Sequence, residues 1–450
     1  MKFQADKDAI VIGAGLTGSL LSMYLAQEGL NVSIFELRPD LRKVDLPAGR
    51  SINMALSHRG ISALQKVGLF EQIKKDLIPM KGRCIHLKGQ DSLHQAYGVD
   101  KDHVIYSISR GLLNKILLEA SEKFPNIEKK FQYRCQWMNY ETNMLFVEDL
   151  DHGREHSFHP NTVLATDGAF SAIRKSMIRQ TRFSFSQQYI EYGYKEITIP
   201  AQNGAHVLDP HALHIWPREQ YMLIALPNVD GSFTCTLFLP YKGEHSFQKL
   251  NTVEDCKVFF DQEFPDLQEY AYDMAQQYVD HPIGDLLTLS SHPWNISGQS
   301  MLLGDAAHCM LPFFGQGMNA AFEDCVLLHK ELEKHDFDFS KAYSEFWPQR
   351  KKDTDAISKM ALDNFSEMRS RVRNPDFHKR KAIEHHLERI YPELYQSLYS
   401  KVSFSLQPYH KILDQELHQT MLIDQILEKN IDCSSPSTQL ESMLRNIRKS

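Results

Sequence analysis

The sequence has little of several features that mark other classes of protein. Its 450 residues include only 22 glycines and 19 prolines, while 42% are hydrophobic. This balance excludes a collagen-like or disordered chain and supplies enough apolar residues for a large core. No segment holds the ~18 consecutive apolar residues that a membrane-spanning helix needs. We therefore expect a cytoplasmic protein without a stable membrane anchor.

Long basic runs and paired cysteine motifs are also missing. The 50 Lys and Arg residues are outnumbered by 57 Asp and Glu residues, so nucleic acid is not an expected partner. The seven cysteines are an odd number with no C-x-x-C motif, which fits a reducing compartment. Cys84 with His86, and His385 with His386, could suggest metal ligation, but no third ligand is evident in the sequence. We expect no metal site.

The order of apolar patterns predicts an α/β fold with a large insertion. Short apolar runs at 9–13, 32–35, 161–165 and 300–303 are typical of buried strands of one sheet, and helical spacing follows the first. Residues from about 180 to 290 form β-rich runs separated by turn residues, which indicate an inserted antiparallel sheet. From Asn319 to about Lys429 the pattern is almost entirely helical.

These patterns divide the chain into three parts. We expect a discontinuous, Rossmann-like dinucleotide-binding domain formed by 1–70, 100–178 and 290–330. A mainly antiparallel substrate domain is expected from 71–99 and 179–289, and a C-terminal helical region from 331–450. A chain of this length is long enough for about three such units.

A glycine-rich turn after the first strand carries the clearest chemical signal. Gly13, Gly15 and Gly18 fit G-x-G-x-x-G, in which glycines allow a tight turn, backbone approach to a pyrophosphate, and helix-to-strand packing. Glu36 ends the next strand, where a carboxylate can accept hydrogen bonds from ribose hydroxyls. The pyrophosphate would lie at the helix N-terminus. The segment therefore predicts dinucleotide binding.

If the dinucleotide is FAD, later segments can supply the further contacts that its isoalloxazine end needs. No second Rossmann fingerprint is present for a tightly held nicotinamide cofactor. Gly304 and Asp305 follow a predicted strand, and the loop after them opens a helix near Asn319, whose dipole can face flavin N1 and O2. Asp167 and Gly168 follow another strand, although a D-G pair is also common in turns that bind no ligand.

The motifs together resemble a known family. GAGLTG, ATDGAFSAIR (165–174), LLGDAAH and PFFGQGMNAAFED stand in the order and spacing of the single-component FAD-dependent aromatic hydroxylases. GRSINMALSHRG (49–60), HIWPR (214–218), SFTCTLFLP (232–240) and NFSEMR (364–369) are similar to the kynurenine 3-monooxygenase group of that family. The resemblance runs from about Ile10 to Phe404 and implies the aromatic hydroxylase fold.

The motifs and the resemblance imply which residues bind FAD, with Thr17 and Cys135 acting through their backbones. The expected cofactor residues are Gly13, Gly15, Thr17, Gly18, Glu36, Arg38, Ala55, Arg110, Cys135, Asp167, Gly168, Gly304, Asp305, Gly317, Met318 and Asn319.

The resemblance also implies a substrate site. Arg83 and Tyr97 are expected at an amino-acid carboxylate, with Asn364 and Tyr399 completing the pocket. Taken alone, an arginine is most often a surface residue, and a tyrosine before a glycine is more often core or turn. Alternating apolar residues are more often a sheet face than a ligand cavity. The expected ring-lining residues are Leu213, Met222, Ile224, Leu226, Phe238, Pro312, Phe313 and Met368.

The activity implied by the resemblance is hydroxylation of L-kynurenine to 3-hydroxykynurenine by a monomer or homodimer. NADPH would bind transiently and reduce FAD, and O2 would then react with the reduced flavin to form a C4a-hydroperoxide. The substrate's aniline nitrogen supplies the nucleophilic push, so no general base is assigned. A flavin halogenase is disfavoured because the four tryptophans are isolated and form no W-x-W-x-I-P stretch. A silent binding protein, as in Rab GDP-dissociation inhibitors, is disfavoured by the intact cofactor motifs.

Overall fold

The chain folds into two compact units, each assembled from separate stretches of sequence. The computed structural model describes residues 8–44, 53–98, 103–180, 182–370, 375–433 and 435–447. Unit 1 comprises Met1–Asp76, Ile108–Tyr189 and Leu287–Ser358. Unit 2 comprises Leu77–Ser107, Ile190–Leu286 and Lys359–Ser450. Residues 331–450, expected as a separate helical region, divide between the two units at Ser358.

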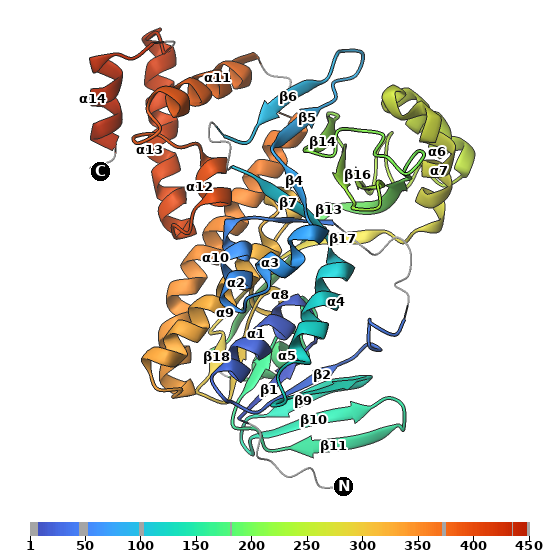
Figure 1. The fold of residues 1–450 in the computed structure, drawn as a ribbon, viewed down its shortest axis with the longest axis vertical. Coiled ribbons are helices and arrows are strands. Elements are labelled where there is room, and N and C mark those ends of the chain that lie inside the picture. Colours follow the sequence, from blue (N-terminus) through green and yellow to red (C-terminus); the bar gives the residue numbers. More distant parts are fainter. Residues whose placement is uncertain are drawn as a thin grey trace. The chain divides into compact units, whose positions relative to one another are not determined.

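A six-stranded sheet forms the centre of unit 1, with the order β18-β19-β12-β1-β2-β8 (Figure 1). All but its antiparallel edge strand β18 are parallel. The four predicted strands are confirmed, and their apolar side chains are buried, as parallel strands require. The strands are β1 (Ala9–Ile12), β2 (Val32–Glu36), β8 (Ile127–Phe131), β12 (Val163–Ala165), β18 (Asn295–Ile296) and β19 (Ser300–Leu302).

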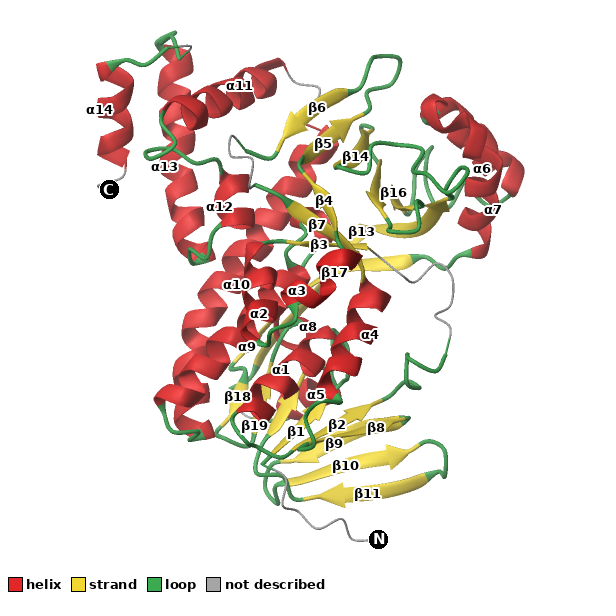
Figure 2. Cartoon of the chain, in the orientation of Figure 1, coloured by secondary structure: helices red, strands yellow, loops and turns green. Residues whose placement is uncertain are grey.

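Helices and a small sheet complete unit 1 (Figure 2). Strands β9 (Tyr133–Asn139), β10 (Met144–Asp149) and β11 (Arg154–Phe158) form a three-stranded antiparallel sheet. The remaining elements are α1 (Leu16–Gln27), β3 (Asn53–Leu56), α2 (His58–Lys66), α3 (Phe70–Ile73), η1 (Lys74–Asp76), α4 (Arg110–Ser121), α5 (Ala172–Met177), α8 (Asp305–His308), η3 (Pro312–Phe314), α9 (Gly317–Lys334) and the first part of α10 (Phe339–Ser370).

The inserted segment forms the seven-stranded sheet that the β-rich pattern predicted. Its order is β17-β13-β16-β15-β14-β5-β6. The strands from β13 to β14 pair antiparallel, as do β5 and β6, whereas β14 pairs parallel with β5. Strands β13 and β17 each run across a boundary between the units. The strands are β5 (Gly82–Ile85), β6 (Leu93–Ala96), β13 (Ser184–Ile199), β14 (Ala212–Pro217), β15 (Met222–Pro227), β16 (Phe233–Pro240) and β17 (Gly284–His292).

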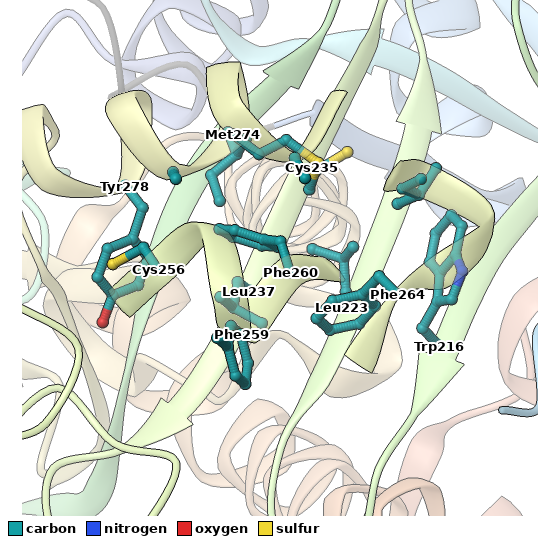
Figure 3. Close-up of a cluster of buried hydrophobic side chains, with 14 of the residues drawn as sticks. Trp216, Leu223, Cys235, Leu237, Cys256, Phe259, Phe260, Phe264, Met274 and Tyr278 are labelled. Carbon is teal, nitrogen blue, oxygen red and sulfur yellow. The ribbon is translucent and has the colours of Figure 1, made fainter. Parts of the chain in front are cut away.

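One face of this sheet is covered by α6 (Val253–Glu263), η2 (Pro265–Tyr270) and α7 (Ala271–Asp280). Figure 3 shows Leu223 and Leu237 from the strands packed against Phe260 and Phe264 from the helical side. Because strand side chains alternate between faces, the neighbours of these core residues point away from α6 and α7.

The other elements of unit 2 are a strand pair and a helical layer. Strand β4 (Ile78–Met80) pairs antiparallel with β7 (Ile105–Ser109). Helices α11 (Pro375–Ile390), α12 (Leu398–Phe404), α13 (Tyr409–Glu428) and α14 (Thr438–Ile447) follow the end of α10. Leu387, Leu422, Ile426 and Leu444 join α11, α13 and α14 in a small apolar core. Across the described residues, each helix is too short or too polar to cross a bilayer.

Candidate cofactor and substrate sites

The three glycines of the first loop have different structural roles. Gly13 has a φ of +99°, and a Cβ there would lie 2.7 Å from the Thr166 carbonyl oxygen. A Cβ on Gly18 would lie 2.0 Å from the Gly13 carbonyl oxygen, so only glycine lets α1 pack this closely on the strand. Gly15 faces open space instead, with nothing within 4 Å of the position that a Cβ would take. Close approach of a ligand to the backbone is therefore possible at Gly15.

Glu36 is fixed beside this loop by hydrogen bonds from the backbone. Its Oε2 accepts from the Ala14 N–H at 2.8 Å, and its Oε1 accepts from the N–H and Nε of Arg38 at 2.9 and 3.0 Å. The Gly13 N–H also donates to the Phe35 carbonyl oxygen at 2.8 Å. A carboxylate oxygen can accept more than one hydrogen bond, so ribose hydroxyls could still reach Glu36.

The Gly304–Asp305 segment lies next to the same loop. Gly304 has a φ of +55°, and a Cβ there would lie 3.1 Å from Thr17 Oγ1. Asp305 begins α8 and is exposed, so its carboxylate is accessible to a ligand. The charges of Asp305 and Arg110 both act on the pKa of the Cys309 thiol, so both residues lie near that thiol. The structure thus brings together loops that are almost 300 residues apart in sequence.

Asp167 supplies a buried acceptor on the neighbouring strand end. Its Oδ2 accepts from the Ala172 N–H at 2.7 Å, whereas its buried Oδ1 has no hydrogen-bond partner among the described residues. Burial raises the pKa of Asp167, and hydrogen bonds from Ser171 and Ala172 offset only part of that shift. Burial likewise raises the pKa of the Cys135 thiol, which interacts with Asp167. A buried acceptor without a partner is costly, and a ligand hydroxyl would satisfy it.

The start of α9 is joined to β3 by Asn319. Its Nδ2 donates to the carbonyl oxygens of Ala55 and Gly315 at 2.8 and 2.9 Å, and its Oδ1 accepts from the Ser57 N–H at 2.9 Å. Because both amide hydrogens are used, any hydrogen bond that Asn319 donates to a cofactor must come from its backbone N–H. The helix begins at Gly317 with no acidic residue in its first turn and no side-chain cap. Its first N–H groups, including that of Met318, suit a developing negative charge.

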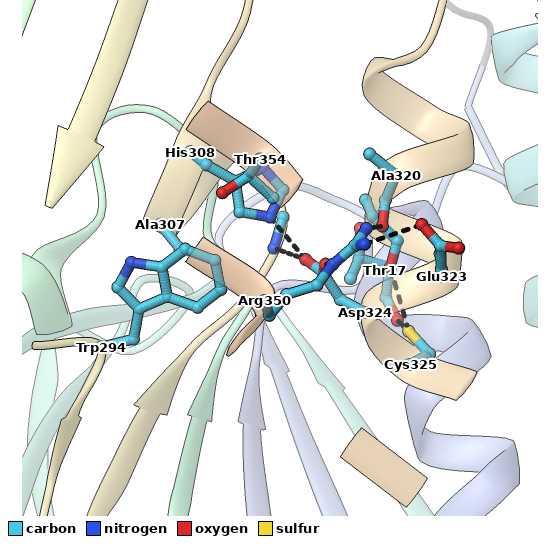
Figure 4. Close-up of polar contacts among 12 residues, drawn as sticks. Thr17, Trp294, Ala307, His308, Ala320, Glu323, Asp324, Cys325, Arg350 and Thr354 are labelled. Carbon is cyan, nitrogen blue, oxygen red and sulfur yellow. Dashed lines mark hydrogen bonds and ion pairs between the residues drawn. The ribbon is translucent and has the colours of Figure 1, made fainter. Parts of the chain in front are cut away.

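A buried network of ion pairs and hydrogen bonds links α9 to the Gly304 segment and to α10. Asp324 on α9 accepts from the Gly304 N–H at 2.9 Å, from His308 Nε2 at 2.6 Å and from Arg350 Nε at 2.7 Å (Figure 4). Burial alone would raise the pKa of Asp324, but His308 and Arg350 outweigh burial and keep it below its ordinary value. The sequence motifs include Gly304, His308 and Asp324 but did not point to Arg350, because nothing local in α10 marks it as a partner of α9.

The residues of unit 1 fit FAD. An open glycine at the turn, a fixed Glu36 at the second strand, an unpaired Asp167 oxygen and an uncapped α9 lie on loops that contact one another. Gly168 also has a positive φ, +78°, and open space at its Cβ position. The glycine turn suits a pyrophosphate, and Glu36 suits a ribose. The Asp167 oxygen suits a polyol hydroxyl, and the start of α9 suits the electron-rich edge of a flavin.

The predicted substrate residues of the inserted sheet lie on one face, opposite α6 and α7. Arg83 on β5 is the register partner of Leu213 on β14, and Met222 on β15 is the partner of Phe238 on β16. Ile224 and Leu226 follow Met222 at the two-residue spacing that keeps side chains on one face. The core residues Leu223 and Leu237 occupy the other face. The alternation is therefore a sheet face. Besides the apolar residues and Arg83, it carries Thr234 and Thr236, the register partners of Leu226 and Ile224, and Glu196 of β13, the partner of Thr236.

Arg83, Tyr97 and Tyr399 form one cluster in unit 2. The Arg83 guanidinium carbon lies 4.3 Å from the centre of the Tyr399 ring and 5.8 Å from that of Tyr97. The two tyrosine rings stack at 5.1 Å with 19° between their planes. Burial raises the pKa of Tyr97 well above its ordinary value, so its phenol stays protonated and can donate a hydrogen bond. One cation and a phenolic donor together suit a carboxylate.

The remaining predicted substrate residues lie in other elements. Asn364 is in α10, next to Phe365, whose ring contacts Tyr192 of β13 edge-on at 5.1 Å. Pro312 and Phe313 belong to η3 of unit 1, where Phe313 is buried and Pro312 exposed. The side chain of Met368 lies outside the described part of the structure. Residues 49–52, the first four of the GRSINMALSHRG motif, also lie outside it.

Comparison with known proteins identifies the family. The FAD binding domain family matches residues 6–257 and 290–335 of the chain. The kynurenine 3-monooxygenase of Myxococcus xanthus is 44% identical over 408 residues, covering 90% of this chain and 88% of that protein. The kynurenine 3-monooxygenase of Dictyostelium discoideum is 39% identical over 445 residues, covering 96% and 95%.

A solved structure is similar in fold alone. That of 2-methyl-3-hydroxypyridine-5-carboxylic acid oxygenase has a TM-score of 0.67 at 16% identity, covering 81% of this chain and 92% of that one. The fold expected from the resemblance is thereby confirmed. With its relatives matching over nearly its whole length and its unit 1 residues fitting FAD, the chain belongs to the kynurenine 3-monooxygenase family of FAD-dependent monooxygenases.

Proposed function

We propose that this enzyme hydroxylates L-kynurenine to 3-hydroxykynurenine with NADPH and O2, in tryptophan degradation or NAD biosynthesis. The names of its relatives support the substrate, since each is called kynurenine 3-monooxygenase. The observation that carries the proposal is the Arg83, Tyr97 and Tyr399 cluster at the edge of an apolar sheet face. L-kynurenine is an amino acid with an aromatic amine, so it needs both a carboxylate anchor and an apolar surface.

Arg83 and the two tyrosines hold the carboxylate end in this proposal. A guanidinium presents parallel N–H donors that match the two oxygens of a carboxylate. Tyr399 lies against the guanidinium and restricts its orientation, and Tyr97 is buried behind it with 5% of its surface exposed. An arginine whose orientation is fixed loses less entropy when it binds.

Leu213, Met222, Ile224, Leu226 and Phe238 hold the ring end. The hydroxyls of Thr234 and Thr236 lie on the same face, but these five side chains themselves offer dispersion contacts that exclude water from the ring, and no proton donor or acceptor. The ring needs none, because the aniline nitrogen already activates the carbon ortho to it. The apolar face therefore orients the ring and keeps water away.

The loops of unit 1 hold the cofactor. Bound FAD would supply the two-electron chemistry and the reaction with O2, after reduction by NADPH. Gly15 would allow the pyrophosphate to approach the α1 N-terminus, Glu36 would accept from the ribose, and the α9 N-terminus would stabilise negative charge on the flavin. Asp324 is a positioning residue in this proposal. It accepts a hydrogen bond from the Gly304 N–H and so anchors α9 to the Gly304 segment.

The test is substrate-stimulated NADPH oxidation with identification of the product. Purified yellow protein should oxidise NADPH faster with L-kynurenine than without it, and the product should gain the mass of one oxygen atom. Anthranilate, which keeps the aromatic amine but lacks the amino-acid side chain, is the matched control and should stimulate much less. Equal rates with and without L-kynurenine, or NADPH oxidation that yields only hydrogen peroxide, would refute the proposed substrate.

A further inference from the structure

A cysteine and two histidines meet on the face of the seven-stranded sheet opposite Arg83. Cys84 on β5 and His214 on β14 are register partners, and His86 lies two residues after Cys84, on the same side of the chain. The sequence alone shows no third ligand for Cys84 and His86. His214 is that third residue, and the pairing of β5 with β14 brings it there from 128 positions away in the chain.

The three side chains are close enough to share one ion. One ligand atom from each lies within 4.8 Å of the other two, and His86 Nε2 is 2.9 Å from His214 Nδ1. Cys84 and His214 are buried, and the His86 ring is stacked on Trp216 with centroids 4.2 Å apart. Ring stacking and burial fix the positions of the three donors before any ion binds.

The outer nitrogen of His86 is held by a carboxylate. His86 Nδ1 lies 2.9 Å from Asp266 Oδ2, which also accepts from Trp216 Nε1 at 2.6 Å. A carboxylate oxygen can accept more than one hydrogen bond, so Asp266 Oδ2 offers an acceptor to His86 Nδ1 as well as to Trp216 Nε1.

The outer nitrogen of His214 is fixed in the same way. His214 Nε2 lies 2.8 Å from the Asp209 carbonyl oxygen, which can only accept a hydrogen bond. If both outer nitrogens donate to these oxygens, His86 Nε2 and His214 Nδ1 face each other as two acceptors across 2.9 Å. That arrangement is repulsive unless a cation lies between the rings.

We propose that Cys84 Sγ, His86 Nε2 and His214 Nδ1 bind a zinc ion. A proton could bridge the two nitrogens, but it would make no use of the sulfur beside them, whereas a cysteine with two histidines is a donor set that zinc favours. Histidines that ligate zinc commonly donate their other N–H to a carboxylate or a backbone carbonyl, as both do here. His94, the register partner of Cys84 on β6, has its Nε2 3.7 Å from Cys84 Sγ, but it is not among the three residues whose ligand atoms all lie within 4.8 Å of one another.

Zinc binding at this position would release a proton and would link neighbouring strands of the sheet. Zinc binds cysteine as a thiolate, so the thiol proton of Cys84 is released to solvent when the sulfur binds the metal. The ion would cross-link β14 with β5 and the residue after it, in the part of the sheet that carries Arg83 on its other face. The site is thus structural, and it is independent of the proposed substrate.

The experiment uses the FAD-loaded enzyme after dialysis against a chelator. Added Zn2+ should bind at one equivalent per chain by metal analysis and calorimetry, and it should raise the melting temperature by mass action. Co2+ should give absorption bands at longer wavelengths than the flavin, with the intensity of a tetrahedral thiolate complex. Cys84→Ser and His86→Gln should each weaken Zn2+ binding at least tenfold, and His94→Gln less.

Matched controls separate this site from adventitious binding. Cys433→Ser and His211→Gln remove a thiol and an imidazole elsewhere in unit 2, and both variants should bind Zn2+ as the parent does. Absence of stoichiometric Zn2+ binding in the parent would overturn the proposal, and would assign the histidine pair to a shared proton instead. Unchanged binding in both Cys84→Ser and His86→Gln would overturn it equally.

Discussion

The guanidinium of Arg83 lies over the ring of Tyr399, with 4.3 Å between its central carbon and the ring centre. The two residues come from β5 and α12, so the contact joins the start of the substrate sheet to the C-terminal helices of unit 2. A cation on an aromatic face is stabilised by about 0.5 to 2 kcal/mol, and it keeps its N–H edge available for an anion. Substrate affinity should therefore depend on both residues.

Arg83→Ala should raise the KM for L-kynurenine on the order of tenfold or more. The expected loss is that of a charge-assisted hydrogen bond, ~1.5 to 3 kcal/mol. Arg83→Lys should recover only part of this loss, since an ammonium group cannot make two parallel bonds. Steady-state NADPH oxidation measures the effect, with Arg134→Ala as a control from the pair with Glu148 on another sheet. An unchanged KM in both Arg83 variants, with FAD retained, would remove Arg83 from the site.

Substitutions at Tyr399 should separate the ring from its hydroxyl. Tyr399→Phe keeps the stacking on Tyr97 and the cation contact, so we expect a rise in KM of roughly tenfold or less, as for one neutral hydrogen bond. Tyr399→Ala also releases the Arg83 guanidinium, and its KM should approach that of Arg83→Ala. In the double variant with Arg83→Ala the two effects should not add, because one residue acts through the other. Full additivity would show that they act independently.

Much of unit 1 could be predicted from the sequence because its signals are local. The glycine turn, the strand ends at Glu36 and Gly304, and the four buried strands are set by residues close together in the chain. Contacts between distant segments could not be predicted in this way. Examples are Arg350 with Asp324, the use of both amide hydrogens of Asn319, and the meeting of His214 with Cys84.

The substrate sheet shows the same division. Alternating apolar residues at 222–226 indicated a strand, but only the register of β14, β15 and β16 decides which residues share a face with Arg83. Only the family resemblance points to Arg83, Tyr97 and Tyr399, since no local pattern distinguishes them from surface or core residues. Their contact is a property of the folded unit.

Gly15→Ala should abolish tight FAD binding without destabilising the apoprotein. Gly15 has an extended backbone, with φ −72° and ψ −172°, that alanine can adopt, and its Cβ position is open. An added methyl group would occupy the space expected for the pyrophosphate, so affinity should fall at least tenfold. Melting of the apoprotein and bound flavin per chain measure the two effects. Gly18→Ala is the contrast, because its clash with the Gly13 carbonyl oxygen should destabilise the apoprotein itself.

Asp324→Asn should destabilise unit 1 in a pH-dependent way. Breaking a buried ionic network costs ~3 to 5 kcal/mol, or roughly 6 to 20 °C in melting temperature at ~2 to 4 °C per kcal/mol. The pKa of Asp324 is lowered in the folded state by His308 and Arg350, against the effect of burial. Its contribution is therefore fully present above the unfolded-state pKa of about 3.9 and is lost as the pH falls through the lower folded value.

Thermal melting of both proteins between pH 7 and pH 3 tests this prediction. The difference between parent and Asp324→Asn should be constant at neutral pH and should shrink only below about pH 4. Asp338→Asn is a control at an exposed carboxylate that pairs with Lys341 on the surface, and it should change little. A difference that already closes between pH 7 and pH 5 would contradict the assignment of a depressed pKa.

Glu36→Ala should weaken FAD binding by about 30- to 1000-fold. The carboxylate is buried at the end of β2, and in the proposed complex it makes two charge-assisted hydrogen bonds to the adenosine ribose, worth roughly 2 to 4 kcal/mol. The substitution also leaves the Ala14 N–H without its 2.8 Å partner, which loosens the turn that the pyrophosphate approaches. Glu36→Gln keeps the size of the side chain and one acceptor oxygen, so its loss should be smaller.

The colour and melting of the Glu36 variants test this role together. Glu36→Ala should purify paler than the parent, with a lower melting temperature that excess FAD restores by mass action. Glu148→Ala is the matched control, since it removes a carboxylate that pairs with Arg134 on the small sheet of unit 1 and that is not itself an expected cofactor residue. If the carboxylate only caps the turn, melting of the apoprotein will fall while flavin per chain after dialysis stays full. That result would assign Glu36 to the fold alone, whereas a pale variant that melts normally as apoprotein would assign it to the cofactor.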